Sequence, residues 1–231
     1  GQIDGAMLSL LLDYFPGEES TELAIGDRFA KYTITDLLGE GGMGRVYQAW
    51  DPDLTRNVAL KLIRPDLLGL GDEPVLLFVG RVQPLKRLGV AVEVLGRIER
   101  QDATLVVVGG PSGSQGEAEL ARVRDRAEDL GVADRIRWVE PVPHHLLSTY
   151  YRAADVCLVP SRSESFGLVA LEAAACGIPV VAAAVGGLRS IVEHGRTGFL
   201  VEGGDPAYCA AYVDEVLGAP ALAEAMGRAA A

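Results

Sequence analysis

Residues 163–172 read Ser163-Glu164-Ser165-Phe166-Gly167-Leu168-Val169-Ala170-Leu171-Glu172. A strand-like apolar run over residues 155–160 precedes this segment, and a helix-like run over 166–176 includes most of it. Glu164 and Glu172 stand eight positions apart, and in a helix of 3.6 residues per turn eight steps return to a similar azimuth. The spacing therefore predicts two carboxylates facing one crevice, with Glu164 at the mouth of the helix and Glu172 about two turns inside it.

The backbone between the two glutamates predicts a phosphate site. The first N–H groups of a helix lack partners within the helix, and the helix dipole favours an anion beside them. Carboxylates for hydroxyls next to amides for phosphate are typical of a nucleotide-sugar site. The alternative is a helix charge at Glu164 and a solvated helix residue at Glu172. The further residues expected to bind ligand here are Ser165, Phe166, Gly167, Leu168 and Val169, of which the glycine permits close approach.

The composition is typical of a cytoplasmic protein. Of the 231 residues 49% are hydrophobic, enough for a sizeable core. No apolar run reaches the ~18 residues of a membrane span. The net charge of −11 argues against a nucleic-acid-binding surface, and an anionic substrate would need a local basic pocket. The cysteines, Cys157, Cys176 and Cys209, are scattered in apolar segments, which favours buried reduced thiols over a disulfide framework or a metal site.

The chain divides near residues 65–72. Residues 1–25 predict a loose lead-in, residues 26–66 have strand-like runs with short turns, and residues 70–231 alternate between strand-like and helix-like runs. Repeated strand–helix units imply an α/β fold with a Rossmann-like, doubly wound parallel sheet, in which ligands bind beyond the carboxyl ends of the strands. The strand-like runs cover 74–79, 103–108, 135–139, 155–159 and 179–183, and the helix-like runs cover 86–100, 115–131, 144–154 and 166–176.

Two cations follow the first of these strands. The segment Gly80-Arg81-Val82-Gln83-Pro84-Leu85-Lys86 lies where the carboxyl end of that strand is expected. Fixed cations there would stabilise the charge that grows on a diphosphate leaving group, Arg81 through a bidentate fork and Lys86 as a point charge. We therefore take Arg81, Lys86 and Glu164 as catalytic candidates and Gly80 as part of the binding site. The alternative is a pair of solvated surface cations.

Four strings resemble the C-terminal, donor-binding half of the retaining GT-B glycosyltransferases, over about residues 70–231. They are Phe-Val-Gly-Arg-Val-Gln-Pro-Leu-Lys from Phe78, Val-Val-Val-Gly-Gly-Pro-Ser-Gly from Val106, Tyr-Arg-Ala-Ala-Asp from Tyr151 and Glu-Ser-Phe-Gly-Leu-Val-Ala-Leu-Glu-Ala from Glu164. The resemblance is closest to members that use an inositol phosphate as acceptor, which implies UDP-N-acetylglucosamine as donor. Sucrose-phosphate-type relatives share much of the pattern, so the donor sugar stays open.

The resemblance implies roles for individual residues. Glu172 would accept hydrogen bonds from the ribose hydroxyls and Glu164 from those of the transferred sugar. The backbone at Val142 would contact the base. Members of the family can hold Mg²⁺ against the backbone of residues 151–154, although Ile178 stands where they usually have threonine. No metal-ligand spacing links the histidines, which are expected at the surface: His144, His145 and His194.

Residues 26–64 resemble the opening of a bacterial serine/threonine protein kinase. The matching strings are Gly39-Glu40-Gly41-Gly42-Met43-Gly44-Arg45-Val46 and Val58-Ala59-Leu60-Lys61. In that family the glycines close a hairpin over the ATP phosphates, and the lysine pairs with those phosphates. No His-Arg-Asp catalytic loop and no Asp-Phe-Gly motif occurs downstream. We therefore expect a non-catalytic segment, with ATP binding as the alternative.

The resemblance also implies a missing partner domain. GT-B enzymes close two Rossmann-like domains around the donor, and the N-terminal one supplies the acceptor site. That domain is not recognisable here, and the C-terminal helices that cross back to it are cut short after Ala231. Because proximity and water exclusion contribute much of catalysis, half a cleft should bind a nucleotide sugar weakly and turn over little. The alternative is a binding or fusion-remnant protein without transfer activity. Neither interpretation requires a cofactor, a nucleic acid or a membrane span.

Overall fold

The computed structural model describes residues 9–11, 23–29, 32–41, 44–62 and 73–230. The chain forms two compact units, residues 1–71 and 72–231. Their boundary falls at the end of the segment in which the sequence patterns change. Each unit has its own sheet.

The first unit is a β-sheet in the order β1-β5-β4-β3-β2. Strand β4 (Gly44–Asp51) pairs antiparallel with both β3 (Tyr32–Gly41) and β5 (Arg56–Leu62). Strand β2 (Arg28–Phe29) pairs antiparallel with β3. Strand β1 (Ser9–Leu11), within the segment expected to be a loose lead-in, pairs parallel with β5. Alternating side chains point to one face and form a small core, as a strand period of two requires. These residues are Tyr32, Ile34, Tyr47, Ala49 and Val58.

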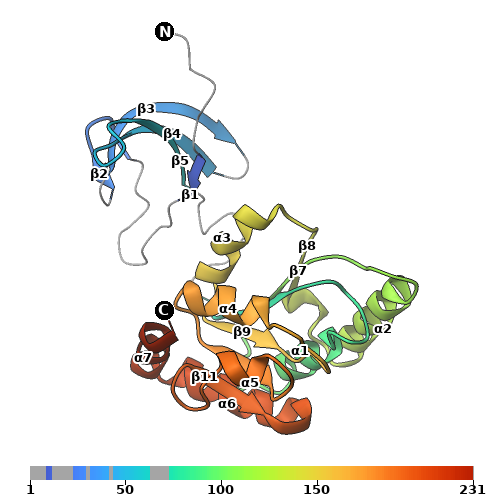
Figure 1. The fold of residues 1–231 in the computed structure, drawn as a ribbon. Helices are drawn as coiled ribbons and strands as arrows, with labels where there is room; N and C mark the ends of the chain where they lie inside the picture. The colour runs from blue at the N-terminus through green and yellow to red at the C-terminus, as the bar shows by residue number, and fades with distance from the viewer. Residues whose placement is uncertain (1–8, 12–22, 30–31, 42–43, 63–72, 231) are drawn as a thin grey trace. The chain divides into compact units, whose positions relative to one another are not determined.

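The second unit contains a six-stranded parallel sheet in the order β11-β10-β9-β6-β7-β8 (Figure 1). The doubly wound α/β fold predicted from the alternating pattern is thereby confirmed. The order reverses between β6 and β9, which are neighbours in the sheet. In open parallel sheets such a reversal opens a crevice at the carboxyl edge. The strands are β6 (Val75–Val79), β7 (Thr104–Val108), β8 (Ile136–Val139), β9 (Val156–Val159), β10 (Val180–Ala183) and β11 (Gly198–Val201).

Helices cover both faces of this sheet. One face, including Leu76 and Phe78 of β6, packs in a single core cluster with α1, α2 and α6. Helix α4 contacts β9 and β10 but contributes no residue to that cluster, so it covers the other face, beside α3 and α5. Helix α7 contacts both α4 and α6, and its Met226 belongs to the first cluster. The helices are α1 (Leu88–Leu95), α2 (Gly116–Asp129), α3 (Leu147–Arg152), α4 (Leu168–Ala175), α5 (Leu188–Ile191), α6 (Pro206–Gly218) and α7 (Pro220–Ala230). Among the described helices, none combines the length and apolar character needed to cross a bilayer.

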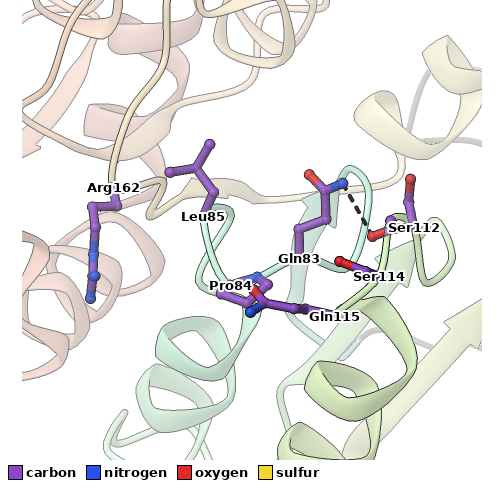
Figure 2. A pocket seen from close by; sticks show the side chains of 8 residues that line it. Gln83, Pro84, Leu85, Ser112, Ser114, Gln115 and Arg162 are labelled. Atoms are coloured by element: carbon purple, nitrogen blue, oxygen red, sulfur yellow. Dashed lines mark hydrogen bonds between the residues drawn. The ribbon is translucent and has the colours of Figure 1, made fainter.

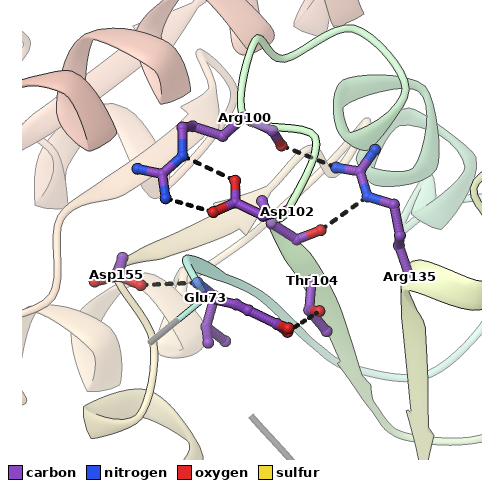
Figure 3. A network of polar contacts seen from close by, with 8 residues as sticks. Glu73, Arg100, Asp102, Thr104, Arg135 and Asp155 are labelled. Carbon is purple, nitrogen blue, oxygen red and sulfur yellow. Dashed lines mark hydrogen bonds and ion pairs between the residues drawn. The ribbon is translucent and has the colours of Figure 1, made fainter. Parts of the chain in front are cut away.

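Polar side chains tie together the starts of the strands, opposite the crevice edge (Figure 3). Asp155 accepts a hydrogen bond from the backbone N–H of Val75 at 2.7 Å, which connects the start of β9 to that of β6. Arg135 donates to the carbonyls of Ala103 at 3.0 Å and Arg100 at 3.1 Å, which connects β8 to β7. These contacts fix the strand starts relative to one another, at the edge of the sheet opposite the crevice.

The cysteines are all free thiols. Cys157 and Cys209 are buried, as predicted, and burial raises the pKa of the Cys209 thiol to about 11. Cys176 departs from the prediction of full burial, because it ends α4 and is partly exposed.

Close packing of α7 on α4 depends on Gly227. A Cβ at this position would lie 2.0 Å from the carbonyl oxygen of Gly177, the left-handed residue just beyond α4. We expect Gly227→Ala to lower the free energy of unfolding by about 1–3 kcal/mol, although alanine is the better helix former. Thermal unfolding followed by circular dichroism at the helix band would measure this. Gly218→Ala at the end of α6, where no atom lies within 4 Å, is the control and should be neutral or stabilising. Equal effects of the two substitutions would contradict the packing argument.

Candidate functional site

Loops from both halves of the sheet meet at the strand-order reversal. The β6–α1 loop (residues 80–87) and the β9–α4 loop (160–167) are joined by a hydrogen bond from Arg162 N–H to the Leu85 carbonyl, at 2.8 Å. The β9–α4 loop is joined in turn to the β10–α5 loop, because Gly187 N–H donates to the Glu164 carbonyl at 2.9 Å. Three segments far apart in sequence thus form one edge.

Lys86 and Glu164, two of the three catalytic candidates, are in direct contact. The distance between Lys86 Nζ and Glu164 Oε2 is 2.6 Å, and the two side chains are only 19% and 16% exposed. The neighbouring Arg87 holds this loop: its backbone is left-handed, with φ 55°, and its guanidinium donates to the carbonyls of Gly203 at 3.0 Å and Gly204 at 3.2 Å. The Lys86 ammonium is therefore presented from a constrained loop.

Glu164 lies outside helix α4, contrary to the prediction that it stands at the mouth of the helix. Helix α4 begins at Leu168, so Glu164 lies in the loop before it, and helical periodicity does not relate it to Glu172. Backbone packing positions it instead. A Cβ on Gly186, whose φ is 46°, would lie 1.9 Å from the Glu164 carbonyl oxygen, so only glycine allows this approach.

Glu172 lies inside α4, as predicted, and both of its carboxylate oxygens have partners. The Tyr151 hydroxyl donates to Oε2 at 2.7 Å, and His144 Nε2 lies 2.8 Å from Oε1. The His144 side chain is 80% exposed, as expected for a surface histidine, but it is also a neighbour of the site. Sequence reasoning missed both partners, because they precede Glu172 by 21 and 28 residues and belong to no local pattern.

The N-terminus of α4 is open. Gly167 has φ 74°, and the first hydrogen bond of the helix runs from Leu171 N–H to the Gly167 carbonyl at 3.0 Å. Among the described residues, no backbone acceptor pairs with the N–H groups of Leu168 and Val169. Ser165 and Phe166, just before the helix, are exposed. Free amides at a helix N-terminus, beside an ammonium and two carboxylates, match the chemistry of a diphosphate joined to hydroxylated rings.

The remaining predicted residues lie at the same edge with fewer contacts. Gly80 directly follows β6 with φ 151°, and its N–H donates to the Val108 carbonyl at 2.9 Å. Arg81 is exposed, and no partner for its guanidinium occurs in the part of the chain that the structure describes. Val142 is half-buried in the loop between β8 and the short 3-10 helix His144–Leu146. Arg81 is therefore a cation available to a ligand.

A cavity of about 400 Å³ opens beside the β6–α1 loop (Figure 2). The β6–α1 loop and the segment before α2 form most of its wall, and Gln83 Nε2 ties them together by donating to the Ser112 carbonyl at 3.2 Å. Leu85 lines the cavity, whereas the next residue, Lys86, reaches Glu164. The lining residues are Gln83, Pro84, Leu85, Ser112, Gly113, Ser114, Gln115 and Arg162.

Two backbone carbonyls at the end of α3 accept hydrogen bonds from the turn that follows. The Thr149 carbonyl accepts from Ala153 N–H and the Tyr151 carbonyl from Ala154 N–H, each at 3.1 Å. Within the described ranges there is also no group of three or more histidine, cysteine, aspartate or glutamate side chains suited to a metal ion.

We expect the Lys86–Glu164 pair to be energetically coupled. In a double-mutant cycle with Lys86→Met and Glu164→Gln, the coupling free energy should be about 1–2 kcal/mol, because both groups are largely shielded from water. The exposed pair Arg189–Glu202, with side chains 51% and 77% exposed, is the control, and Arg189→Met with Glu202→Gln should couple by less than about 0.5 kcal/mol. Urea unfolding of the single and double variants measures both. Equal coupling in the two cycles would show that the site pair is solvated.

Known proteins resemble this chain over most of its length. The D-inositol 3-phosphate glycosyltransferase of Frankia alni is 53% identical over 175 residues, which cover 71% of this chain and 43% of that protein. The protein of the same name from Streptosporangium roseum is 49% identical over 226 residues, 91% of this chain and 51% of that protein. The chain thus spans about half, or less, of these relatives.

Two solved structures share the fold. Sucrose-phosphate synthase from Thermosynechococcus elongatus has a TM-score of 0.67 at 36% identity, covering 74% of this chain and 46% of that one. Anabaena HepE, in complex with UDP and glucose, has a TM-score of 0.66 at 26% identity, covering 71% and 44%. The profile described as "Glycosyl transferases group 1" matches residues 61–231, most of the chain. The protein therefore belongs to the group 1 glycosyl transferases.

Proposed function

We propose that the second unit binds a UDP-sugar and is the donor-binding half of a retaining glycosyltransferase. The observation that carries the proposal is the Lys86–Glu164 contact, 2.6 Å long, at the strand-order reversal and on the loop that leads into the open N-terminus of α4. It brings a cation for phosphate and a carboxylate for sugar hydroxyls to one point. The bound UDP and glucose of the related HepE structure support the choice of ligand.

The contact between Lys86 and Glu164 is compatible with a bound donor. A lysine ammonium has three N–H groups, so Lys86 can keep its hydrogen bond to Glu164 and still donate to a phosphate oxygen. Arg81 adds a second cation, and the amides of Leu168 and Val169 add neutral donors. Glu172 then accepts from the ribose hydroxyls, and the Val142 backbone contacts the base.

The same groups would promote transfer. The bond between the anomeric carbon and the phosphate oxygen breaks while the acceptor oxygen bonds to that carbon from the face that the nucleotide leaves. The acceptor proton passes to the departing diphosphate. Negative charge grows on the leaving oxygen in the transition state, where Arg81 and Lys86 stabilise it. Glu164 orients the transferred sugar through its hydroxyls.

The names of the relatives suggest the substrates. An inositol phosphate is the acceptor that their shared name indicates, and UDP-N-acetylglucosamine is the donor that we propose with it. Because the chain spans about half of these relatives, we propose that acceptor binding belongs to the part of them that it does not cover. The second unit by itself would then bind donor but transfer sugar slowly, if at all. A binding protein without transfer activity is the alternative.

Isothermal titration with UDP and UDP-N-acetylglucosamine tests the donor site. We expect both ligands to bind, and Arg81→Ala or Glu172→Ala to weaken UDP binding by about 10- to 100-fold, as the loss of a charge-assisted hydrogen bond does. Arg228→Ala, which removes an exposed arginine from the last turn of α7, is the control and should leave the affinity unchanged.

Two outcomes would count against the donor site. Absence of binding at millimolar UDP by the folded protein would refute it. Binding that neither Arg81→Ala nor Glu172→Ala weakens would place the nucleotide elsewhere and favour the alternative of a binding protein with an unrelated site.

For the first unit we propose a kinase N-lobe-like sheet without catalytic activity. Its hairpin β3–β4 carries Gly39, Gly41 and Gly44, and the register places Lys61 of β5 opposite Val46 of β4. This arrangement agrees with the resemblance, but the chain has no His-Arg-Asp or Asp-Phe-Gly motif to supply a base or bind a metal.

We expect ATP with Mg²⁺ at millimolar concentration to leave the melting temperature of the protein unchanged. Differential scanning fluorimetry measures this, with ADP and buffer as controls. A rise of several degrees that Lys61→Ala abolishes would show instead that the first unit binds ATP, because a ligand that binds only the folded state stabilises it.

A further inference from the structure

The two partners of Glu172 differ in their exposure to water. Tyr151, on α3, has only 1% of its surface exposed, and its hydroxyl donates to Oε2 at 2.7 Å. His144, in the 3-10 helix before α3, has a side chain that is 80% exposed and lies 2.8 Å from Oε1. One oxygen of the carboxylate is therefore bound to a group that solvent does not reach, and the other to a group that solvent or a ligand can replace.

We propose that Tyr151 is a positioning residue for Glu172: its buried hydroxyl holds Oε2, so that Oε1 is presented to the ribose hydroxyls of the nucleotide, which displace His144. This inference rests on the proposed function. It adds a residue that determines how strongly the site recognises the ribose, and it assigns His144 as the group that occupies the place of a ribose hydroxyl when no ligand is bound.

The hydrogen-bonding capacity of Glu172 is sufficient for both roles. An ionised carboxylate has about four lone-pair positions, and Tyr151 can donate to only one of them. Positions therefore remain on both oxygens for a vicinal diol. Burial and the adjacent Glu172 carboxylate raise the pKa of Tyr151, so the hydroxyl keeps its proton and stays a donor.

Positioning matters because Glu172 is on the surface of its helix and partly exposed. A free glutamate side chain samples several rotamers, and ordering it on ligand binding costs conformational entropy. A hydrogen bond from a buried and rigid tyrosine removes much of that cost before the ligand arrives. Helix α3 packs on α4, which keeps the tyrosine at a constant distance from the carboxylate.

The test compares UDP with 2′,3′-dideoxy-UDP, which lacks both ribose hydroxyls of the diol. We expect the ratio of the two affinities in the wild-type protein to favour UDP by about 10-fold or more, because the dideoxy analogue lacks the hydrogen bonds to the charged carboxylate. Tyr151→Phe should reduce this ratio several-fold by weakening UDP alone, with the affinity for the dideoxy analogue unchanged. A residue that served only the packing of the domain would weaken both ligands equally and leave the ratio as it is.

Two variants of nearby residues serve as controls. Tyr150→Phe removes the hydroxyl of the adjacent, half-buried tyrosine of α3 and should leave the ratio at the wild-type value. His144→Ala should leave the affinity for UDP unchanged or increase it, because the ribose no longer displaces a histidine. A drop in UDP affinity with His144→Ala would overturn the assignment of this residue.

The outcomes separate this inference from the proposed function. If the wild-type protein does not bind UDP, both fail. If it binds UDP but Tyr151→Phe keeps the full ratio, the positioning role alone fails. Should Tyr151→Phe not fold, Glu172→Asp replaces it as the test, because the shorter side chain keeps its charge but is withdrawn from Tyr151. A wild-type ratio in Glu172→Asp would then overturn the role of the tyrosine.

Discussion

The parallel pairing of β6 with β9 brings together loops that are about 80 residues apart in the chain. Since helices must cover both faces of a parallel sheet, the strand order reverses at this pair, and the following loops diverge to opposite faces and leave a crevice between them. The ammonium of Lys86 and the carboxylate of Glu164 meet at that crevice. No single loop supplies both groups.

Close backbone packing then determines the details of the crevice. Gly186 allows the β10–α5 loop to lie against the carbonyl of Glu164, and Gly187 donates to the same carbonyl. A side chain at Gly186 would clash with the backbone of the loop that carries Glu164. The charged groups of the site are thus positioned by contacts between uncharged backbone atoms, which explains why glycines flank it.

The diphosphate and the ribose of the proposed ligand meet different kinds of group in the site. Donors with hydrogen-bonding capacity to spare, the exposed Arg81 and the three N–H groups of Lys86, suit a diphosphate, whose charge changes during transfer. The buried Tyr151 suits the ribose, which takes no part in bond breaking and needs only a fixed acceptor. The part of the site that recognises the nucleoside is therefore ordered before the ligand binds.

Local patterns were sufficient to predict that the second unit has a parallel, doubly wound sheet. Continuous apolar runs predicted five of its strands. The sixth strand, β11, was not predicted, because its four residues, Gly198–Val201, are too few for a clear pattern. The sequence also pointed to Glu164 and Glu172, but through a helical spacing that the loop before α4 does not have. The contacts of Glu172 with Tyr151 and His144, the packing of Gly186 on Glu164 and the cavity beside Leu85 depended on the tertiary structure. Each arises between segments brought together only when the sheet is assembled, and no periodicity within one segment carries that information.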